Sequence, residues 1–125
     1  MATRVVDASV WAAFLFGEPR HEEAKSRCEG HTLYAPTLLP YEVQNVAVTK
    51  IRKHPEQKDA ILKSLSMGMD YDRLTLVGLE DSPVASLALE TDLTAYDASY
   101  LLLCNRLNCQ LVTFDQTLRQ AADTN

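Results

Sequence analysis

The sequence is poor in the residues that link a small domain covalently or hold a zinc ion. Its 125 residues include three cysteines without a C-x-x-C pair and three scattered histidines without an H-E-x-x-H motif. This scarcity argues against a disulfide framework and against zinc chemistry, and it favours a reducing compartment. The four glycines form neither a phosphate-binding loop nor a dinucleotide-binding motif, so a nucleotide cofactor is not expected.

Long hydrophobic runs and an excess of positive charge are also missing. Asp7 interrupts the first apolar stretch and Glu18 follows soon after. Neither a secretion leader nor a membrane span is therefore expected, and we predict a cytoplasmic protein. Twelve Lys and Arg residues against 17 Asp and Glu residues give a formal net charge of -5. This balance argues against a protein that coats nucleic acid without specificity.

Hydrophobic residues are abundant, at 46% of the chain. A chain of this length buries roughly two-thirds of its unfolded surface on folding, and no repeat or linker divides it, so residues 1–125 are predicted to form a single domain. Short β-branched runs alternate with helical patterns, which implies a parallel sheet covered by helices on both faces. The predicted strands are 4–6, 32–35, 74–77 and 110–113. The predicted helices are 9–16, 19–28, 40–53, 56–67, 83–91 with Ser82 as N-cap, 94–107, and 115 or 116 to 122.

Four acidic residues are expected to meet at one edge of that sheet. Asp7 directly follows the first strand, and Asp115 follows the fourth after a single residue. Both therefore project from the carboxyl ends of strands, where open parallel sheets bind ligands. Glu42 lies on or beside the apolar stripe of the helix after the second strand, and Asp97 is the only formal charge between residues 95 and 105. Because these helices begin at the same edge, their acids are predicted to approach the same crevice.

Each acid alone also has an ordinary structural explanation. Asp7 and Asp115 have the positions of helix N-caps, Asp97 could belong to a capping box with Thr94, and Glu42 could complement a helix dipole. Four carboxylates at one edge, however, repel one another in a partly desolvated cleft unless cations neutralise them. Oxygen ligands of this kind suit Mg²⁺ or Mn²⁺. Two such ions roughly 3.5 to 4 Å apart support hydrolysis of a phosphodiester bond, which is nuclease chemistry.

Four short motifs carry a resemblance to a known family. They are Val-Val-Asp7-Ala-Ser9, Leu-Pro-Tyr-Glu42-Val-Gln-Asn45, Tyr-Asp97-Ala and Leu-Val-Thr113-Phe-Asp115. Their order and spacing, over essentially the whole chain, resemble the PIN domain, and within it the VapC-type toxin ribonucleases of prokaryotic toxin–antitoxin pairs. The resemblance implies a three-layer α/β/α sandwich, RNA cleavage that depends on Mg²⁺ or Mn²⁺, a homodimer, and a VapB-like antitoxin that blocks the site. Family members commonly have a final edge strand after the last helix, so the resemblance implies a central sheet of four or five strands.

The resemblance also assigns roles to individual residues. It implies that the catalytic and metal-binding carboxylates are Asp7, Glu42, Asp97 and Asp115. Their supporting neighbours would be Ser9, Asn45 and Thr113. The chemistry of these three side chains supports that second role independently, because hydroxyl and amide groups orient carboxylates and bound waters.

Two further groups of residues allow both a functional and a structural interpretation. The basic cluster Lys50, Arg52 and Lys53 is predicted to be either a phosphate-binding edge for RNA or a solvated helix end. The aromatic residues Trp11, Phe14 and Phe16 are predicted to form either a patch that faces an antitoxin or a part of the core. In the antitoxin interpretation, a partner arginine would reach the carboxylates and replace the positive charge of the metal.

The sequence leaves three candidate functions. The first is a metal-dependent endoribonuclease, the toxin of a VapBC-type pair. The second is a catalytically inactive PIN-like module that binds RNA or protein, although loss of activity would usually remove an acid and all four positions are filled. The third is a structure-specific DNA nuclease, because the sequence does not reveal what would read a 2′-hydroxyl.

Overall fold

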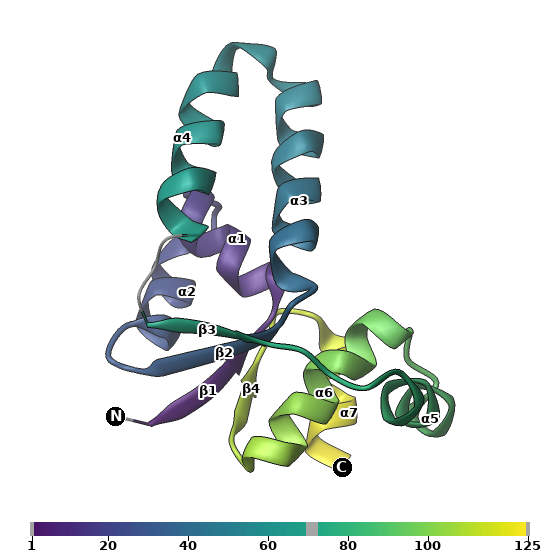
Figure 1. Ribbon diagram of the computed structural model, residues 1–125. Helices are drawn as coiled ribbons and strands as arrows, with labels where there is room; N and C mark the ends of the chain where they lie inside the picture. The colour runs from purple at the N-terminus through teal and green to yellow at the C-terminus, as the bar shows by residue number, and fades with distance from the viewer. Residues whose placement is uncertain (1, 70–72, 125) are drawn as a thin grey trace.

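A four-stranded parallel sheet is the centre of the computed structural model, which describes residues 2–69 and 73–124 (Figure 1). Its strands, in the order β3-β2-β1-β4, are β1 (Thr3–Val6), β2 (Thr32–Pro36), β3 (Leu74–Val77) and β4 (Gln110–Val112). In the register of the sheet, Val5 pairs with Tyr34 on one side and with Leu111 on the other. All four strands therefore end at the same edge of the sheet. The predicted bounds of each strand are correct to within one residue at either end.

Helices cover both faces of this sheet, as predicted. In the described part of the chain they are α1 (Ala8–Phe16), α2 (His21–Cys28), α3 (Leu39–Lys53), α4 (Lys58–Met69), α5 (Asp81–Thr91), α6 (Ala95–Leu107) and α7 (Gln116–Thr124). A 3-10 turn, η1 (Pro55–Gln57), joins α3 to α4. Helices α1 and α2 lie on one face and α6 and α7 on the other, whereas α3 and α4 extend beyond the sheet as a helical hairpin (Figure 1). The three-layer α/β/α architecture is thus confirmed.

Most helix ends follow their sequence signals, but three predicted starts are wrong, those of α2, α4 and α5. Helix α5 begins at Asp81, so Ser82 is not its N-cap and Pro83 lies in the first turn, where a missing N–H group does no harm. Helix α2 begins at His21 rather than at residue 19, because the His21 N–H group donates to the Glu18 carbonyl at 2.8 Å and closes a turn. Helix α4 begins at Lys58 rather than at residue 56, because Pro55–Gln57 form the 3-10 turn η1. Helices α4 and α7 also end two residues later than predicted. Each of these differences moves a helix end by two residues without affecting the sheet.

The hydrophobic core lies between the sheet and its two helical layers. Helix α6 is a largely buried helix, as predicted, with Tyr100, Leu101 and Leu103 all within 2% of complete burial. Trp11 on α1 is also fully buried in this core. The proposal that Trp11 faces an antitoxin is therefore wrong, because no surface of its ring is available to a partner. Among the described residues, every helix is either too short or too polar to cross a bilayer.

Candidate active site

A pocket of about 170 Å³ opens at the carboxyl edge of the sheet, and all four predicted acids line it. Two come from strand ends, because Asp7 directly follows β1 and Asp115 lies between β4 and α7. The other two, Glu42 and Asp97, lie in the first turns of α3 and α6. The structure therefore brings to one place four acids that are 108 positions apart at their extremes. We call this the acid pocket.

Asp7 is the most buried of the four carboxylates, with 6% of the residue exposed. Its Oδ1 atom accepts hydrogen bonds from the Ser9 hydroxyl at 2.6 Å and from the Val10 N–H group at 3.2 Å, and its Oδ2 atom accepts one from the Thr113 hydroxyl. Burial raises the pKa of Asp7, although these hydrogen bonds oppose the increase. The bond to Val10 makes Asp7 the N-cap of α1. The capping and the pocket interpretations of this residue are therefore both correct.

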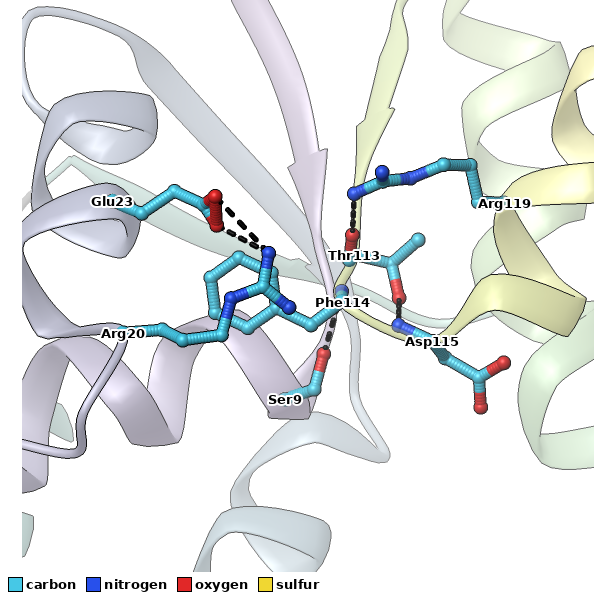
Figure 2. Close-up of polar contacts among 7 residues, drawn as sticks. All are labelled: Ser9, Arg20, Glu23, Thr113, Phe114, Asp115 and Arg119. Carbon is cyan, nitrogen blue, oxygen red and sulfur yellow. Dashed lines mark hydrogen bonds and ion pairs between the residues drawn. The ribbon is translucent and has the colours of Figure 1, made fainter.

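The hydroxyl groups of Ser9 and Thr113 connect Asp7 to the loop that leads into α7. The Thr113 hydroxyl accepts from the Asp115 N–H group at 3.0 Å, and the Ser9 hydroxyl accepts from the Phe114 N–H group at 3.0 Å (Figure 2). Asp115 in turn caps α7, because its Oδ1 atom accepts from the Leu118 N–H group at 3.0 Å. Each hydroxyl thus donates to Asp7 and accepts from the backbone of this loop, which fixes Asp7 and Asp115 relative to each other.

Glu42 is held by a residue that the sequence analysis missed. The buried Tyr100 hydroxyl donates to its Oε1 atom at 2.6 Å. Burial and the neighbouring Glu42 carboxylate raise the pKa of Tyr100, so this hydroxyl remains a proton donor. Burial also raises the pKa of Glu42, with smaller contributions from Asp97 and Asp7, against the effect of the Tyr100 bond. The signal in the sequence was a tyrosine three residues after Asp97, on the same side of an apolar helix.

Asp97 adds to the negative charge of the acid pocket. Burial is the largest cause of its raised pKa, and repulsion from Asp115 and Asp7 adds to it. Its backbone N–H group donates to the Thr94 hydroxyl at 3.1 Å, so Thr94 caps α6 as its sequence suggests. Three of the four carboxylates therefore have a raised pKa because they are buried, and two of these because they also lie near other carboxylates.

The chemistry of this donor set fits a hard divalent cation. Every polar side chain of the acid pocket offers oxygen, the ligand that Mg²⁺ and Mn²⁺ prefer. Within residues 2–69 and 73–124, no three His, Cys, Asp or Glu side chains are grouped closely enough to enclose an ion directly. Mg²⁺ keeps several waters and needs only one or two direct carboxylates. A pocket of about 170 Å³ holds several waters at roughly 30 Å³ each, so the residues suit a hydrated ion.

The other predicted residues lie outside the acid pocket. Asn45 is exposed on α3 and lines a neighbouring hollow with Glu42. Lys50 forms an ion pair with Glu18, at 3.2 Å between Nζ and Oε2. Arg52 and Lys53 are exposed at the far end of α3, roughly 15 Å along the helix axis from Glu42 at about 1.5 Å per residue. The RNA-binding role of this cluster stays a prediction.

A second feature that the sequence analysis missed lies beside Ser9. The Arg20 guanidinium group stacks over the Phe114 ring, 3.7 Å from its centroid, and forms an ion pair with Glu23 (Figure 2). Ser9, Arg20 and Phe114 line a pocket of about 340 Å³. The stacking braces the loop before α7 against the start of α2.

Comparison with known proteins agrees with this architecture. The model of the PIN domain family matches residues 4–124. The curated protein Ribonuclease VapC3 of Pyrobaculum aerophilum is 30% identical over 122 residues, which cover 93% of this chain and 92% of that protein. The crystal structure of PAE2754 from Pyrobaculum aerophilum superposes with a TM-score of 0.74 at 26% identity, over 98% of this chain and 91% of that chain. With a family match over almost its whole length, the chain belongs to the PIN domain family.

Proposed function

We propose that this protein is a metal-dependent endoribonuclease, the toxin of a VapBC-type toxin–antitoxin pair. The observation that carries the proposal is the acid pocket, where Asp7, Glu42, Asp97 and Asp115 line one cavity at the carboxyl edge of the sheet. Similarity to a protein named Ribonuclease VapC3 over 93% of the chain supports RNA as the substrate. By the same similarity we propose a VapB-like antitoxin as partner, a homodimeric assembly and a cytoplasmic location.

In this proposal the four carboxylates would hold a hydrated Mg²⁺ or Mn²⁺ ion, which would supply the positive charge that activates water and stabilises the leaving oxygen of a phosphodiester. The protein contributes a fixed arrangement of oxygens. Ser9 and Thr113 orient the Asp7 carboxylate, and Tyr100 orients that of Glu42. These hydroxyls act as donors, so they leave the carboxylates ionised and directed into the pocket.

The experiment that tests this function uses purified protein, free of any partner, and mixed cellular RNA. We expect cleavage when Mg²⁺ or Mn²⁺ is added and none in a chelator, with cut ends that map to defined positions. Single-stranded and structured DNA serve as parallel substrates, because selective cleavage of DNA would favour the structure-specific DNA nuclease. Absence of any cleavage with either ion would favour the inactive binding module.

Asp7→Asn should reduce metal-dependent cleavage by more than about 100-fold while the fold remains intact. Even changes to groups that only orient metal ligands reduce activity by 10- to 100-fold, and this variant removes the negative charge itself. The amide still caps α1 through its oxygen. The matched control is Asp123→Asn, which removes an exposed carboxylate on α7 and should cleave like the wild type. Circular dichroism and the melting temperature check the fold, and an unfolded Asp7→Asn protein would instead indicate a structural role.

A further inference from the structure

Two exposed tyrosines mark a hollow beside the acid pocket that the proposed chemistry does not use. This hollow has a volume of about 500 Å³, and its wall includes Tyr41 from α3 and Tyr96 from α6. The two residues are 72% and 62% exposed. The hollow shares Ala8, Ser9 and Glu42 with the acid pocket. A ligand bound between the tyrosines therefore touches the same wall as a group bound at the carboxylates.

The position of the tyrosines is tied to that of the acids. Tyr41 immediately precedes Glu42, and Tyr96 immediately precedes Asp97. Each helix thus contributes a carboxylate to the wall of the acid pocket and, from the neighbouring residue, a tyrosine to the wall of the hollow. Because α3 and α6 come from different parts of the chain, only the fold brings the two rings to one cavity.

The remaining wall of the hollow suits a flat ligand with a polar edge. Leu38 and Val46 supply apolar surface, and Asn45 lies one helical turn after Tyr41 on the same side of α3. Its amide group offers two donors and an acceptor. Aromatic stacking combined with hydrogen bonds to the base edge is how proteins recognise unpaired nucleobases. A volume of about 500 Å³ lies within the range of small-ligand sites.

The charge of the protein favours a contact of this kind. Nucleic-acid binding usually draws its affinity from Lys and Arg contacts to phosphates. Here the net charge is -5, and the acid pocket repels phosphate unless a cation neutralises its carboxylates. Base stacking supplies binding free energy that does not depend on the charge of the protein, roughly 5- to 150-fold in affinity for each stacked base, from the 1–3 kcal/mol measured by alanine substitution.

From these observations we infer that Tyr41 and Tyr96 hold an unpaired nucleobase of the RNA next to the phosphodiester that is cut. The inference rests on the proposed ribonuclease function and adds to it a binding site for one base of the RNA. In a duplex both faces of a base are covered by its neighbours, so a paired base cannot stack on either tyrosine ring. Tyr41 and Tyr96 are thus positioning residues that select accessible, single-stranded segments.

Binding is measured in an Asp7→Asn background with Mg²⁺ present, so that the RNA remains uncut. The probe is a short single-stranded RNA that carries 2-aminopurine, whose fluorescence is quenched when it stacks on a ring. We expect Tyr41→Ala and Tyr96→Ala each to weaken binding by about 5- to 150-fold and to reduce the quenching. Tyr→Phe variants, which keep the π face, should bind within about 2-fold of the background, whereas Tyr→Leu variants should bind like Ala.

Cleavage by the same tyrosine variants with Asp7 restored gives a second measurement. We expect KM for single-stranded RNA to rise with little change in kcat, and the wild type to cut the same sequence poorly when it is annealed to its complement. Leu89→Ala is the control, because this residue is 87% exposed on α5, outside the hollow. It should change neither binding nor cleavage.

The outcomes separate the inference from the proposed function. Tyr→Ala variants that bind and cut like an active wild type would overturn the inference and leave the ribonuclease function standing. RNA that binds with tyrosine-dependent quenching but is never cut by the wild type would support base binding by the tyrosines and contradict the ribonuclease function. Variants that cut normally but escape inhibition by a co-expressed antitoxin would show that the hollow docks a protein, which also overturns the inference.

Discussion

At the scale of single residues, Asp7 supports both the fold and the acid pocket with one carboxylate. Its Oδ1 atom caps α1 by accepting a hydrogen bond from the Val10 N–H group. Its two oxygens also accept hydrogen bonds from the hydroxyl groups of Ser9 and Thr113, which connect the ends of β1 and β4. Removing a helix cap typically costs about 1 kcal/mol, whereas burying a carboxylate among others is unfavourable. The stability of the protein without metal is therefore a balance between these two effects. Asp97 shows the second effect more simply, because its raised pKa comes from burial and from the carboxylates of Asp115 and Asp7.

A pH titration should reveal the energetic cost of the acid pocket. Asp97 has a raised pKa in the folded protein, so the folded state binds its proton more tightly than the unfolded state does. Its unfavourable contribution is absent below the ordinary pKa of 3.8 and grows as pH rises through the raised value. Asp97→Asn should therefore raise the melting temperature of the metal-free protein at neutral pH, and this advantage should shrink as pH falls toward 4.

Two comparisons check the source of this effect. Asp123→Asn, on the exposed surface of α7, should show no such pH-dependent gain. Saturating Mg²⁺ should stabilise the wild type more than Asp97→Asn, because only the wild type keeps all four negative charges. A gain that is equal at pH 4 and pH 7 would mean that Asp97 carries no penalty as a carboxylate.

At the scale of secondary structure elements, the sequence predicts strands and helices well because each has its own pattern. Strand-end acids such as Asp7 can be placed from sequence, since the carboxyl ends of parallel strands share one edge. Tyr100 and Arg20 cannot be placed in this way. Their partners, Glu42 and Phe114, are 58 and 94 positions away, and such pairs depend on how helices pack. The same is true of Trp11, whose helical spacing is compatible with both a core and a surface position.

The basic end of α3 allows a test of whether this helix contributes to RNA binding. We expect the triple change of Lys50, Arg52 and Lys53 to Gln to weaken RNA binding and to flatten its salt dependence. Each lost phosphate contact lowers the slope of log affinity against log salt by about 0.7 for a single strand, so the total is at most about 2. The pairing of Lys50 with Glu18 makes a smaller change more consistent with the structure. Metal affinity should be unaffected.

Filter binding at several salt concentrations measures this slope. The control is Lys63→Gln, a single basic residue on the exposed surface of α4, which should have at most the effect of one contact. An unchanged slope in the triple variant would show that this cluster is a solvated helix end and that the RNA is held elsewhere.

The contact between α1 and α4 predicts a different effect, on stability alone. A Cβ atom at Gly68 would lie 2.2 Å from Leu15 Cδ2 and 2.8 Å from its Cγ, so the whole side chain would have to move. Overpacking costs typically 1–3 kcal/mol, against a gain of about 1 kcal/mol from replacing glycine by alanine within a helix. Gly68→Ala should therefore lower the free energy of unfolding by up to about 2 kcal/mol, measured by denaturant titration. Gly78→Ala, with open space around its Cβ position, is the control, and equal stability of both variants would contradict this packing.

At the scale of the whole molecule, an active ribonuclease must be kept from the RNA of its own cell. The partner that we propose is a VapB-like antitoxin, and the acid pocket indicates how it would act. An arginine from the partner offers a planar set of donors matched to carboxylates and can replace the positive charge of the metal. Apolar residues beside that arginine cannot pack on Trp11, which is buried, so they must use surfaces around the pocket.

Expression in a bacterial host tests this regulation. Intact protein produced alone should arrest growth, and co-expression with the neighbouring small gene should restore it. Asp97→Ala should be harmless alone, because it removes one of the four carboxylates, whereas Asp123→Ala should arrest growth like the wild type. Normal growth at a verified level of intact protein would instead favour the inactive binding module. Arrest by Asp97→Ala as well would mean that toxicity comes from binding rather than from cleavage, because that variant lacks a complete acid pocket.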